Sequence, residues 1–194
     1  MRRLIRRIRS RNRQATQLRM NYPNLQVSAY TLPCPYNLRP WQPGDEGQWV
    51  NLLNGCRQLG TWNLERLEHE ISNFHVAGTQ YFVSHDCSQL VSGAGVYERS
   101  STSWEIGWVA TMPKHRGHGL AKAVTTAAIL SALNLPSRPI CLFTDDYRLP
   151  AIKSYLKIGF IPDCNWSADK KKWDKVFKKL GSDYDTYRSS TNWR

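Results

Sequence analysis

Residues 113–124, PKHRGHGLAKAV, place two glycines at the start of a helix-forming segment of small apolar residues. Lys114 and Arg116 bring positive charge to the same loop. The first backbone N–H groups of a helix have no acceptor within it and carry a partial positive charge, so they attract phosphate. Glycine leaves those groups uncovered by side chains. A simpler interpretation, in which Gly117 and Gly119 only form a tight turn, stays open at this point.

Two common nucleotide-binding motifs do not describe this loop. A Walker A loop requires G-x-x-x-x-G-K-[ST], which is missing here. The dinucleotide fingerprint G-x-G-x-x-G would require a glycine at position 122, where this chain has Lys122. Any phosphate that binds this loop is therefore expected to belong to another class of ligand.

Regular elements are predicted on both sides of the loop from the spacing of apolar residues. A strand, helix, strand sequence around the loop implies a parallel pairing of those two strands. An α/β fold is expected. Strands are predicted at 36–41, 80–86, 90–98, 103–111 and 139–145, and helices within 42–56, at 63–72, 119–133, 151–158 and 167–180.

Three motifs in order give this chain a resemblance to a known family. Residues 116–121, RGHGLA, match the R/Q-x-x-G-x-G/A loop of the GNAT superfamily of N-acyltransferases. Residues 105–113, EIGWVATMP, are similar to its strand ending in V-x-P, and residues 151–160, AIKSYLKIGF, resemble its A-I-x-x-Y-x-x-x-G-F helix. Residues 38–54 look like the opening strand and helix. The resemblance covers about residues 36–162 and implies a mixed central sheet, splayed at the acyl-CoA site and flanked by helices.

This resemblance implies acetyl-CoA or a related acyl-CoA as co-substrate and no metal. The pyrophosphate would lie on the N–H groups of residues 117–121, and the pantetheine arm would run beside residues 108–111. The residues expected to contact the co-substrate are Val109, Ala110, Thr111, Arg116, Gly117, His118, Gly119, Leu120 and Ala121.

Acyl transfer to an amine requires proton movements that the family assigns to side chains. By resemblance, Tyr155 is expected to protonate the leaving sulfur. The attacking amine must be neutral although its pKa is about 10.4, so a base is required. Glu105 is the first candidate for that base, with Asp145 and Asp146 as reserves. An ordinary solvated carboxylate remains the alternative for each of the three.

The histidines and cysteines indicate no metal centre. His115 and His118 are expected to be solvated or to contact a CoA phosphate, because no further ligands share their spacing. The five cysteines are scattered and form no C-x-x-C pair, which favours a reducing compartment and a cytoplasmic location.

Positive charge is concentrated in the first residues of the chain. The formal net charge is +12, and residues 1–19 contain eight arginines and no acidic residue. We predict a flexible basic arm at 1–33, a GNAT domain at 34–164 and a C-terminal amphipathic helix with a tail at 165–194. The arm is interpreted as a solvated tail, a contact for a polyanion or an organelle transit peptide.

The run 123–135 is too short to span a membrane, and no membrane partner is expected.

Direct transfer of an acetyl group from acetyl-CoA to a primary amine is the predicted activity. The acceptor is a small-molecule amine or a protein amine, expected near the loop 56–62. The alternative is a non-catalytic acyl-CoA-binding module, or an RNA- or ribosome-associated module that uses the arginine-rich arm. Where the family has a final hairpin, the sequence after residue 162 predicts a helix.

Overall fold

The computed structural model describes residues 17–23, 26–164, 167–181, 184 and 186–187. The chain divides into two compact units. The central unit is Asn24–Ile140, and the terminal unit combines Met1–Pro23 with Cys141–Arg194. Both ends of the chain therefore contribute to one unit.

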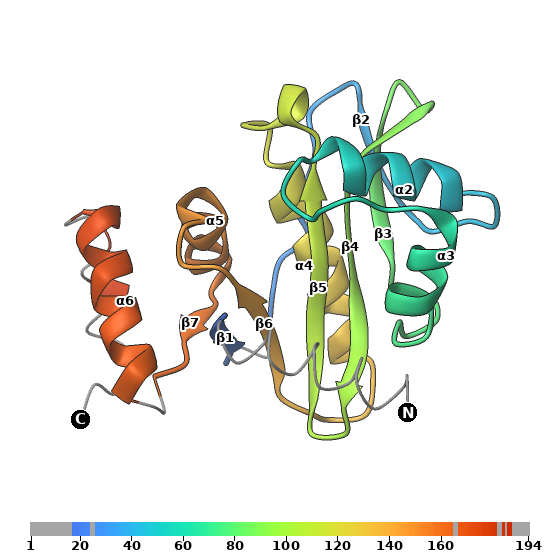
Figure 1. Ribbon diagram of the computed structural model, residues 1–194. Coiled ribbons are helices and arrows are strands. Elements are labelled where there is room, and N and C mark those ends of the chain that lie inside the picture. The colour runs from blue at the N-terminus through green and yellow to red at the C-terminus, as the bar shows by residue number, and fades with distance from the viewer. Residues whose placement is uncertain (1–16, 24–25, 165–166, 182–183, 185, 188–194) are drawn as a thin grey trace. The chain divides into compact units, whose positions relative to one another are not determined.

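The central unit is built on four antiparallel strands in the order β2-β3-β4-β5. Helices α2 and α3 cover one face of this sheet, and α4 covers the other (Figure 1). A π-helical turn, Glu68–Ser72, continues α3. The elements are β2 (Tyr36–Pro40), α2 (Glu46–Gly55), α3 (Leu64–Leu67), β3 (Tyr81–His85), β4 (Gln89–Ser100), β5 (Ser103–Thr111) and α4 (Leu120–Leu133).

Helix α2 forms as the sequence predicts, and the helix predicted at 63–72 is the short α3 continued by the π-helical turn. The apolar stripe of α2, Trp49, Leu52 and Leu53, is buried in the core against the sheet. Asn63 caps α3, because its side-chain oxygen accepts a hydrogen bond from the backbone N–H of Arg66 at 2.8 Å. The cap fixes where the helix begins and so sets the length of the loop that precedes it.

Helix α4 follows the glycine loop and packs against β4 and β5. Its inward face is made of small side chains, including Ala123, Ala127 and Ala128. Small residues let a helix approach a sheet closely. The N-terminus of α4 is thereby fixed directly beside the end of β5.

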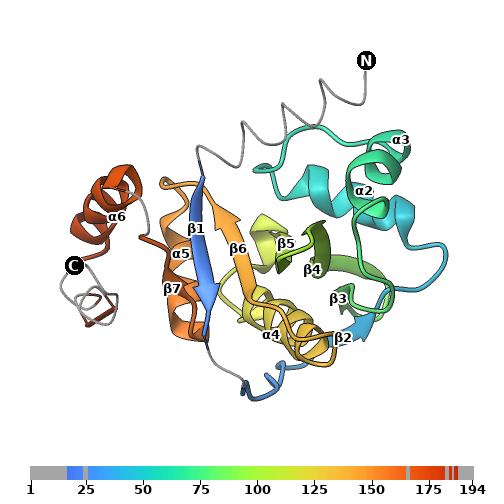
Figure 2. The same cartoon turned by 90° about the horizontal axis from the view of Figure 1, so that it is seen from below.

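In the terminal unit the strands lie in the order β6-β1-β7, with α5 and α6 beside them (Figure 2). The apolar stripe of α6, Trp173, Val176, Phe177 and Leu180, is buried, and this helix packs against α5 and β1. The elements are β1 (Leu18–Tyr22), β6 (Ile140–Thr144), α5 (Leu149–Ile158), β7 (Ile161–Pro162) and α6 (Ser167–Leu180).

Strand β1 lies within the range predicted as a basic arm, and the sequence did not indicate it. Leu18, Met20 and Tyr22 are buried, while the residues between them are half exposed. β1 pairs antiparallel with β7, with Met20 opposite Pro162. The sequence predicts no hairpin after residue 162. The antiparallel partner of β7 comes instead from the N-terminal segment, as strand β1. The arginine-rich residues 1–16 lie outside the described residues.

Within the described residues, no helix has the length and apolar character that a membrane crossing requires.

Candidate active site

A β-bulge interrupts β5 near its middle. Gly93 lies opposite Ala110 and Gly95 lies opposite Gly107, so Trp108 and Val109 together face the single residue Ala94. Trp108 adopts a φ of 51°, a backbone conformation that is strained for a bulky side chain. Bulges leave an extra residue outside the strand ladder and redirect the chain locally. Strain of this kind gathers at functional sites, so the bulge marks a candidate reaction centre.

Glu105 lies on β5 before the bulge and is almost entirely buried, with 8% of its surface exposed. The register of the sheet places it opposite Tyr97 of β4. Arg99, two residues further along β4, brings Nη1 to 3.7 Å from Glu105 Oε1. Burial raises the pKa of the Tyr97 phenol, and the positive charge of Arg99 partly opposes that shift. A carboxylate, a guanidinium and a neutral phenol are therefore gathered on one face of the sheet.

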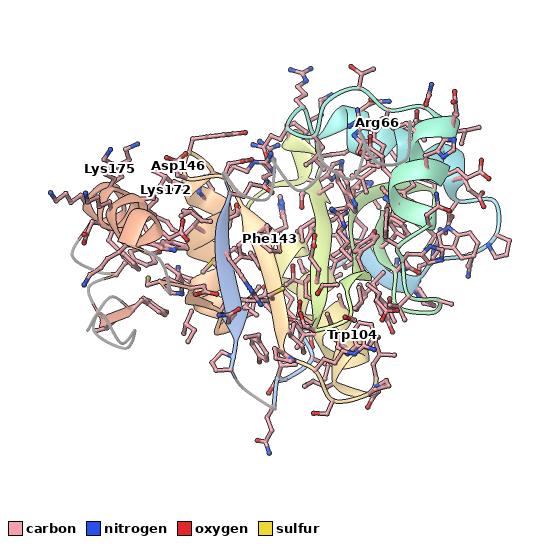
Figure 3. The ribbon with its side chains drawn as sticks, turned by 60° about the horizontal axis from the view of Figure 1, so that its bottom comes forward. Arg66, Trp104, Phe143, Asp146, Lys172 and Lys175 are labelled. Carbon is pink, nitrogen blue, oxygen red and sulfur yellow. The ribbon has the colours of Figure 1, made fainter. Side chains whose placement is uncertain are left out.

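Two tryptophans border this group. The rings of Trp62 and Trp108 meet edge to face with centroids 4.7 Å apart. Trp62 ends the loop 56–62, and its backbone N–H donates to Asn54 Oδ1 at 2.7 Å. Arg66, labelled in Figure 3, stacks its guanidinium 4.1 Å above the Trp62 ring. The loop that the sequence analysis placed near the acceptor is thus held against the bulge by aromatic and cation–π contacts.

At the other end of β5 the chain enters the glycine loop. Gly117 and Gly119 both have positive φ, 87° and 76°, which side chains disfavour. Gly119 is the N-cap of α4, and no side chain caps the helix there. The space beside Gly117 is open, because a Cβ atom added to this residue would have no heavy atom of another part of the chain within 4 Å. The first N–H groups of α4 therefore begin beside an open loop.

Tyr30 crowds the second glycine. A Cβ on Gly119 would lie 2.7 Å from Cε1 of the Tyr30 ring, closer than real Cβ contacts. Lys122 Nζ lies 4.8 Å from the centroid of the same ring. Gly119 is thus required by its backbone conformation and by the packing of Tyr30. Tyr30 lies in the predicted arm and belongs to none of the motifs found in the sequence.

Arg116 contacts backbone carbonyls in this structure. Its Nη2 donates to the Cys56 carbonyl at 2.9 Å, and its Nε donates to the Thr111 carbonyl at 3.4 Å. These bonds tie the glycine loop to the end of β5 and to the start of the loop 56–62. A role for Arg116 in holding the loop is therefore visible, and its predicted contact with the co-substrate stays a prediction.

The remaining residues predicted to contact the co-substrate occupy varied environments. Ala110 is buried, and its carbonyl accepts a hydrogen bond from Ser92 Oγ at 2.8 Å. Thr111 shares a 2.9 Å hydrogen bond with the same hydroxyl, and Val109 lies in the bulge. Leu120 is buried in the core beneath the loop. His118 is exposed, and Ala121 is half-buried in the first turn of α4.

A cluster of rings flanks the glycine loop. Tyr36 Oη and His115 Nδ1 are 3.1 Å apart, and the His85 and His115 rings lie 5.0 Å apart. Burial lowers the pKa of His115, and His85, His118 and Lys114 lower it further. His115 is therefore neutral near pH 7. In the described ranges, no group of three His, Cys, Asp or Glu side chains could hold a metal ion.

Tyr155 lies on α5 in the terminal unit and is buried, with 7% of its surface exposed. The centroid of its ring lies 6.0 Å from the centroid of the Phe160 ring. Burial raises the pKa of its phenol to about 12, although the charge of Arg148 acts in the opposite direction. A phenol with this pKa stays protonated at neutral pH, and it is a weaker acid than an exposed tyrosine.

The reserve carboxylates lie near the start of α5. Asp145 Oδ2 pairs with Arg148 Nη2 at 2.8 Å and accepts a hydrogen bond from Tyr147 Oη at 3.2 Å. Asp146 is exposed at the surface of the terminal unit (Figure 3). Asp145 Oδ1 also accepts a 3.3 Å hydrogen bond from Gln17 Nε2, so three side chains engage this carboxylate. Asp146 is solvated, and both are therefore weaker candidates for a base than Glu105.

One cysteine, Cys164, lies in the terminal unit after β7. Cys164 is partly buried, and burial, with the nearby Asp163, raises the pKa of its thiol to about 11. The thiolate is the nucleophilic form of cysteine, so this side chain is unreactive at neutral pH.

Comparison with known proteins places these features in context. A family model described as GNAT acetyltransferase matches residues 5–169. The mycothiol acetyltransferases of Pseudarthrobacter chlorophenolicus and Thermobispora bispora are similar to this chain, with 29% identity over 170 residues and 26% over 156. The alignments cover 81% and 74% of this chain and 51% of each relative. The chain therefore spans about half the length of the curated relatives it matches.

Solved structures share the fold. A GCN5-related N-acetyltransferase from Sphaerobacter thermophilus matches with a TM-score of 0.63 at 17% identity, over 76% of this chain and 48% of its own. The protein of the same description from Kribbella flavida matches with a TM-score of 0.54 at 15% identity, over 75% and 54%. These matches confirm the predicted α/β fold class, with a mixed central sheet flanked by helices.

Proposed function

This chain belongs to the GNAT acetyltransferase family, and from that premise we propose that it transfers an acetyl group from acetyl-CoA directly to a primary amine. One observation carries the proposal: a bulged strand bearing a buried glutamate is followed, after a short loop with two glycines, by a helix that begins at a glycine. The first half of that arrangement suits proton transfer from an amine, and the second suits a phosphate.

The glycine loop is the part that would hold the pyrophosphate of acetyl-CoA. The backbone N–H groups of residues 117–121 would bind it, supported by the partial positive charge of the α4 N-terminus. Open space at Gly117 and the missing side-chain cap at Gly119 support this role. Val109, Ala110 and Thr111 would align the pantetheine arm through their backbone. Because the Tyr30 ring packs on Gly119, a ligand that contacts Gly119 must also contact Tyr30 or displace it.

Glu105 is proposed as the base that takes the proton of the attacking amine. Its burial and its place on β5 before the bulge support this choice over Asp145 and Asp146. The strained backbone at Trp108 would offer an N–H group to the oxyanion that develops on the acetyl carbonyl. Tyr155, with its pKa raised to about 12, is proposed as the acid that protonates the departing sulfur.

The acceptor is proposed to be a small amine. The curated relatives are named for mycothiol, but they are at most 29% identical to this chain, which spans about half of their length. Their acceptor is therefore not carried over to this chain. Trp62 and Trp108 border the group around Glu105, and we take these bulky side chains to favour a compact acceptor over a protein surface.

A thiol-release assay tests the proposal. The full chain is incubated with acetyl-CoA and a panel of small amines, amino acids and lysine peptides, and CoA release is followed against a control without amine. We expect amine-dependent release with at least one small amine, and release that is lost in Glu105→Gln. Thermal stabilisation by CoA without release on any amine would contradict the proposal and support the non-catalytic acyl-CoA-binding alternative.

A further inference from the structure

Arg99 occupies an unusual position beside the proposed base. Its guanidinium carbon lies 5.3 Å from the centroid of the Trp108 ring and 5.6 Å from that of Tyr97. Its Nη1 is 3.7 Å from Glu105 Oε1, at the long end of the range for an ion pair. A quarter of the side chain is exposed. The cation thus lies close to two aromatic rings, with part of its surface open and only a loose contact to the carboxylate.

Buried donors in this group lack partners. Arg99 Nε and Trp108 Nε1 have no hydrogen-bond partner among the residues that the structure describes. Buried polar atoms in native proteins are nearly always hydrogen-bonded, and each exception requires an explanation. Both atoms are donors only, so the group they could satisfy is an oxygen acceptor. Together with the positive charge of Arg99, they favour an anionic oxygen group.

We propose that Arg99 binds the carboxylate of a free α-amino acid whose amine is acetylated beside Glu105, an inference that rests on the acetyl transfer proposed above. The amine and the carboxylate of an α-amino acid are attached to one carbon, so they are close enough to contact two side chains that themselves lie 3.7 Å apart. The amine would face Glu105 and the carboxylate would face Arg99. The guanidinium fork matches the two oxygens of a carboxylate.

A purely structural role for Arg99 makes a different prediction. If Arg99 served only to neutralise the buried Glu105, its loss would impair transfer to every amine alike. If it binds the acceptor, its loss impairs transfer only to amines that carry a carboxylate. The two roles therefore separate when substrates that differ in the carboxylate alone are compared.

The test uses matched acceptors with the full chain. The first set is L-phenylalanine, L-phenylalanine amide and phenethylamine, and the second is L-alanine, L-alanine amide and ethylamine. We expect kcat/KM for the amino acids to exceed that for the amides and amines by about 10- to 100-fold, as for a hydrogen bond to a charged group. Arg99→Gln should remove that preference and leave the KM for acetyl-CoA unchanged. Arg99→Lys should restore part of it, because the charge is kept and the fork is lost.

Arg138 supplies a matched control. It pairs with Glu98 and stacks 4.2 Å above the ring of Trp104, which Figure 3 labels, so it is another arginine of the central unit held by a glutamate and a tryptophan. Arg138→Gln removes the same charge and the same kind of contacts, and we expect it to keep the preference for amino acids.

Calorimetric titration of both amino acids, without acetyl-CoA, tests the carboxylate site independently of turnover. Binding that is lost in Arg99→Gln and kept in Arg138→Gln supports the site. Equal binding by Arg99→Gln, or an equal loss of turnover with L-phenylalanine and phenethylamine, would overturn the inference and leave the acetyl transfer standing. Arg99-dependent binding without thiol release on any amine would instead keep the carboxylate site and overturn the transfer.

Discussion

The two ends of β5 differ in the groups that they present. Beyond Thr111 the chain offers bare backbone, two glycines with positive φ and an uncapped helix N-terminus. Around Glu105 it offers side chains, a buried carboxylate and an arginine close to two aromatic rings. Under the proposed function, backbone groups would bind what every acyl-CoA shares, whereas side chains can be exchanged to select one acceptor. We therefore expect substitutions near Glu105 to change rate and specificity, and substitutions in the glycine loop to change affinity for acetyl-CoA.

The largest effect is expected at the side-chain end. Glu105→Gln removes the proposed base and should lower kcat/KM by about 10²- to 10⁴-fold, the range for loss of general base catalysis. The rise of kcat/KM with pH on the acid side should disappear as well. Glu98→Gln is the control, because Glu98 lies on β4 and is paired with Arg138. A variant at position 105 that keeps the wild-type pH profile would mean that the base lies elsewhere.

In the terminal unit, Tyr155→Phe tests whether one side chain affects the rate of acetyl transfer without affecting the binding of acetyl-CoA. Losing the phenol should lower kcat by about 10²-fold, the low end of the range for general acid catalysis, while the Kd for acetyl-CoA stays unchanged, because a proton is donated only as the sulfur departs. Tyr147→Phe is a suitable control, since Tyr147 is 66% exposed. Full activity of Tyr155→Phe would show that another group protonates the sulfur.

The backbone end is tested by comparing the two glycines. Gly117→Ala should lower the free energy of unfolding by about 1–2 kcal/mol, the cost of a side chain in the left-handed region. Gly119→Ala should lower it by about 2–4 kcal/mol, because the new methyl group also meets Tyr30. Denaturant titration measures both.

Affinity gives the second half of that comparison. Gly117→Ala should weaken acetyl-CoA binding about tenfold in calorimetry, as loss of one hydrogen bond to a charged group would, with little change in kcat. Unchanged binding by this variant would refute the proposed role of the loop in holding the pyrophosphate.

Alkaline pH should produce the smallest effect. In the unfolded chain, the pKa of a cysteine is about 8.5 and that of a tyrosine is about 10. The pKa of Cys164 is raised to about 11 and that of Tyr155 to about 12 in the folded state. The folded chain therefore holds more protons above about pH 9, so its stability falls as the pH rises. Cys164→Ser and Tyr155→Phe should each flatten the fall of Tm with pH, and unaltered slopes in both would contradict these shifts.

Much of the fold could be predicted from the sequence because its signals are local. The apolar stripe of α2 and the Asn63 cap of α3 follow from helical spacing and capping chemistry. Strand β1 was missed because its five residues lie beside an arginine-rich segment, and their partner β7 is about 140 residues away in the sequence, a distance over which spacing gives no signal.

The candidate site divides in the same way. Glu105 and the glycine loop were predicted because they lie within motifs that resemble the family. Arg99 and Tyr97 were not, because only the antiparallel register of β4 and β5 brings them to Glu105. Tyr30 was missed because its contact with Gly119 depends on how an irregular segment packs. Tertiary contacts of this kind leave no pattern within one stretch of sequence.

Two-substrate initial-velocity kinetics test the central claim, direct transfer from acetyl-CoA to an amine, most directly. Acetyl-CoA is varied at several fixed concentrations of an amine that the thiol-release assay identifies, and the mass of the protein is measured after incubation with acetyl-CoA alone. Direct transfer predicts intersecting reciprocal plots and an unmodified protein, because both substrates must be bound before the acetyl group moves. Parallel plots together with an acetylated protein would contradict the account, because they would mean that a side chain carries the acetyl group between the two substrates.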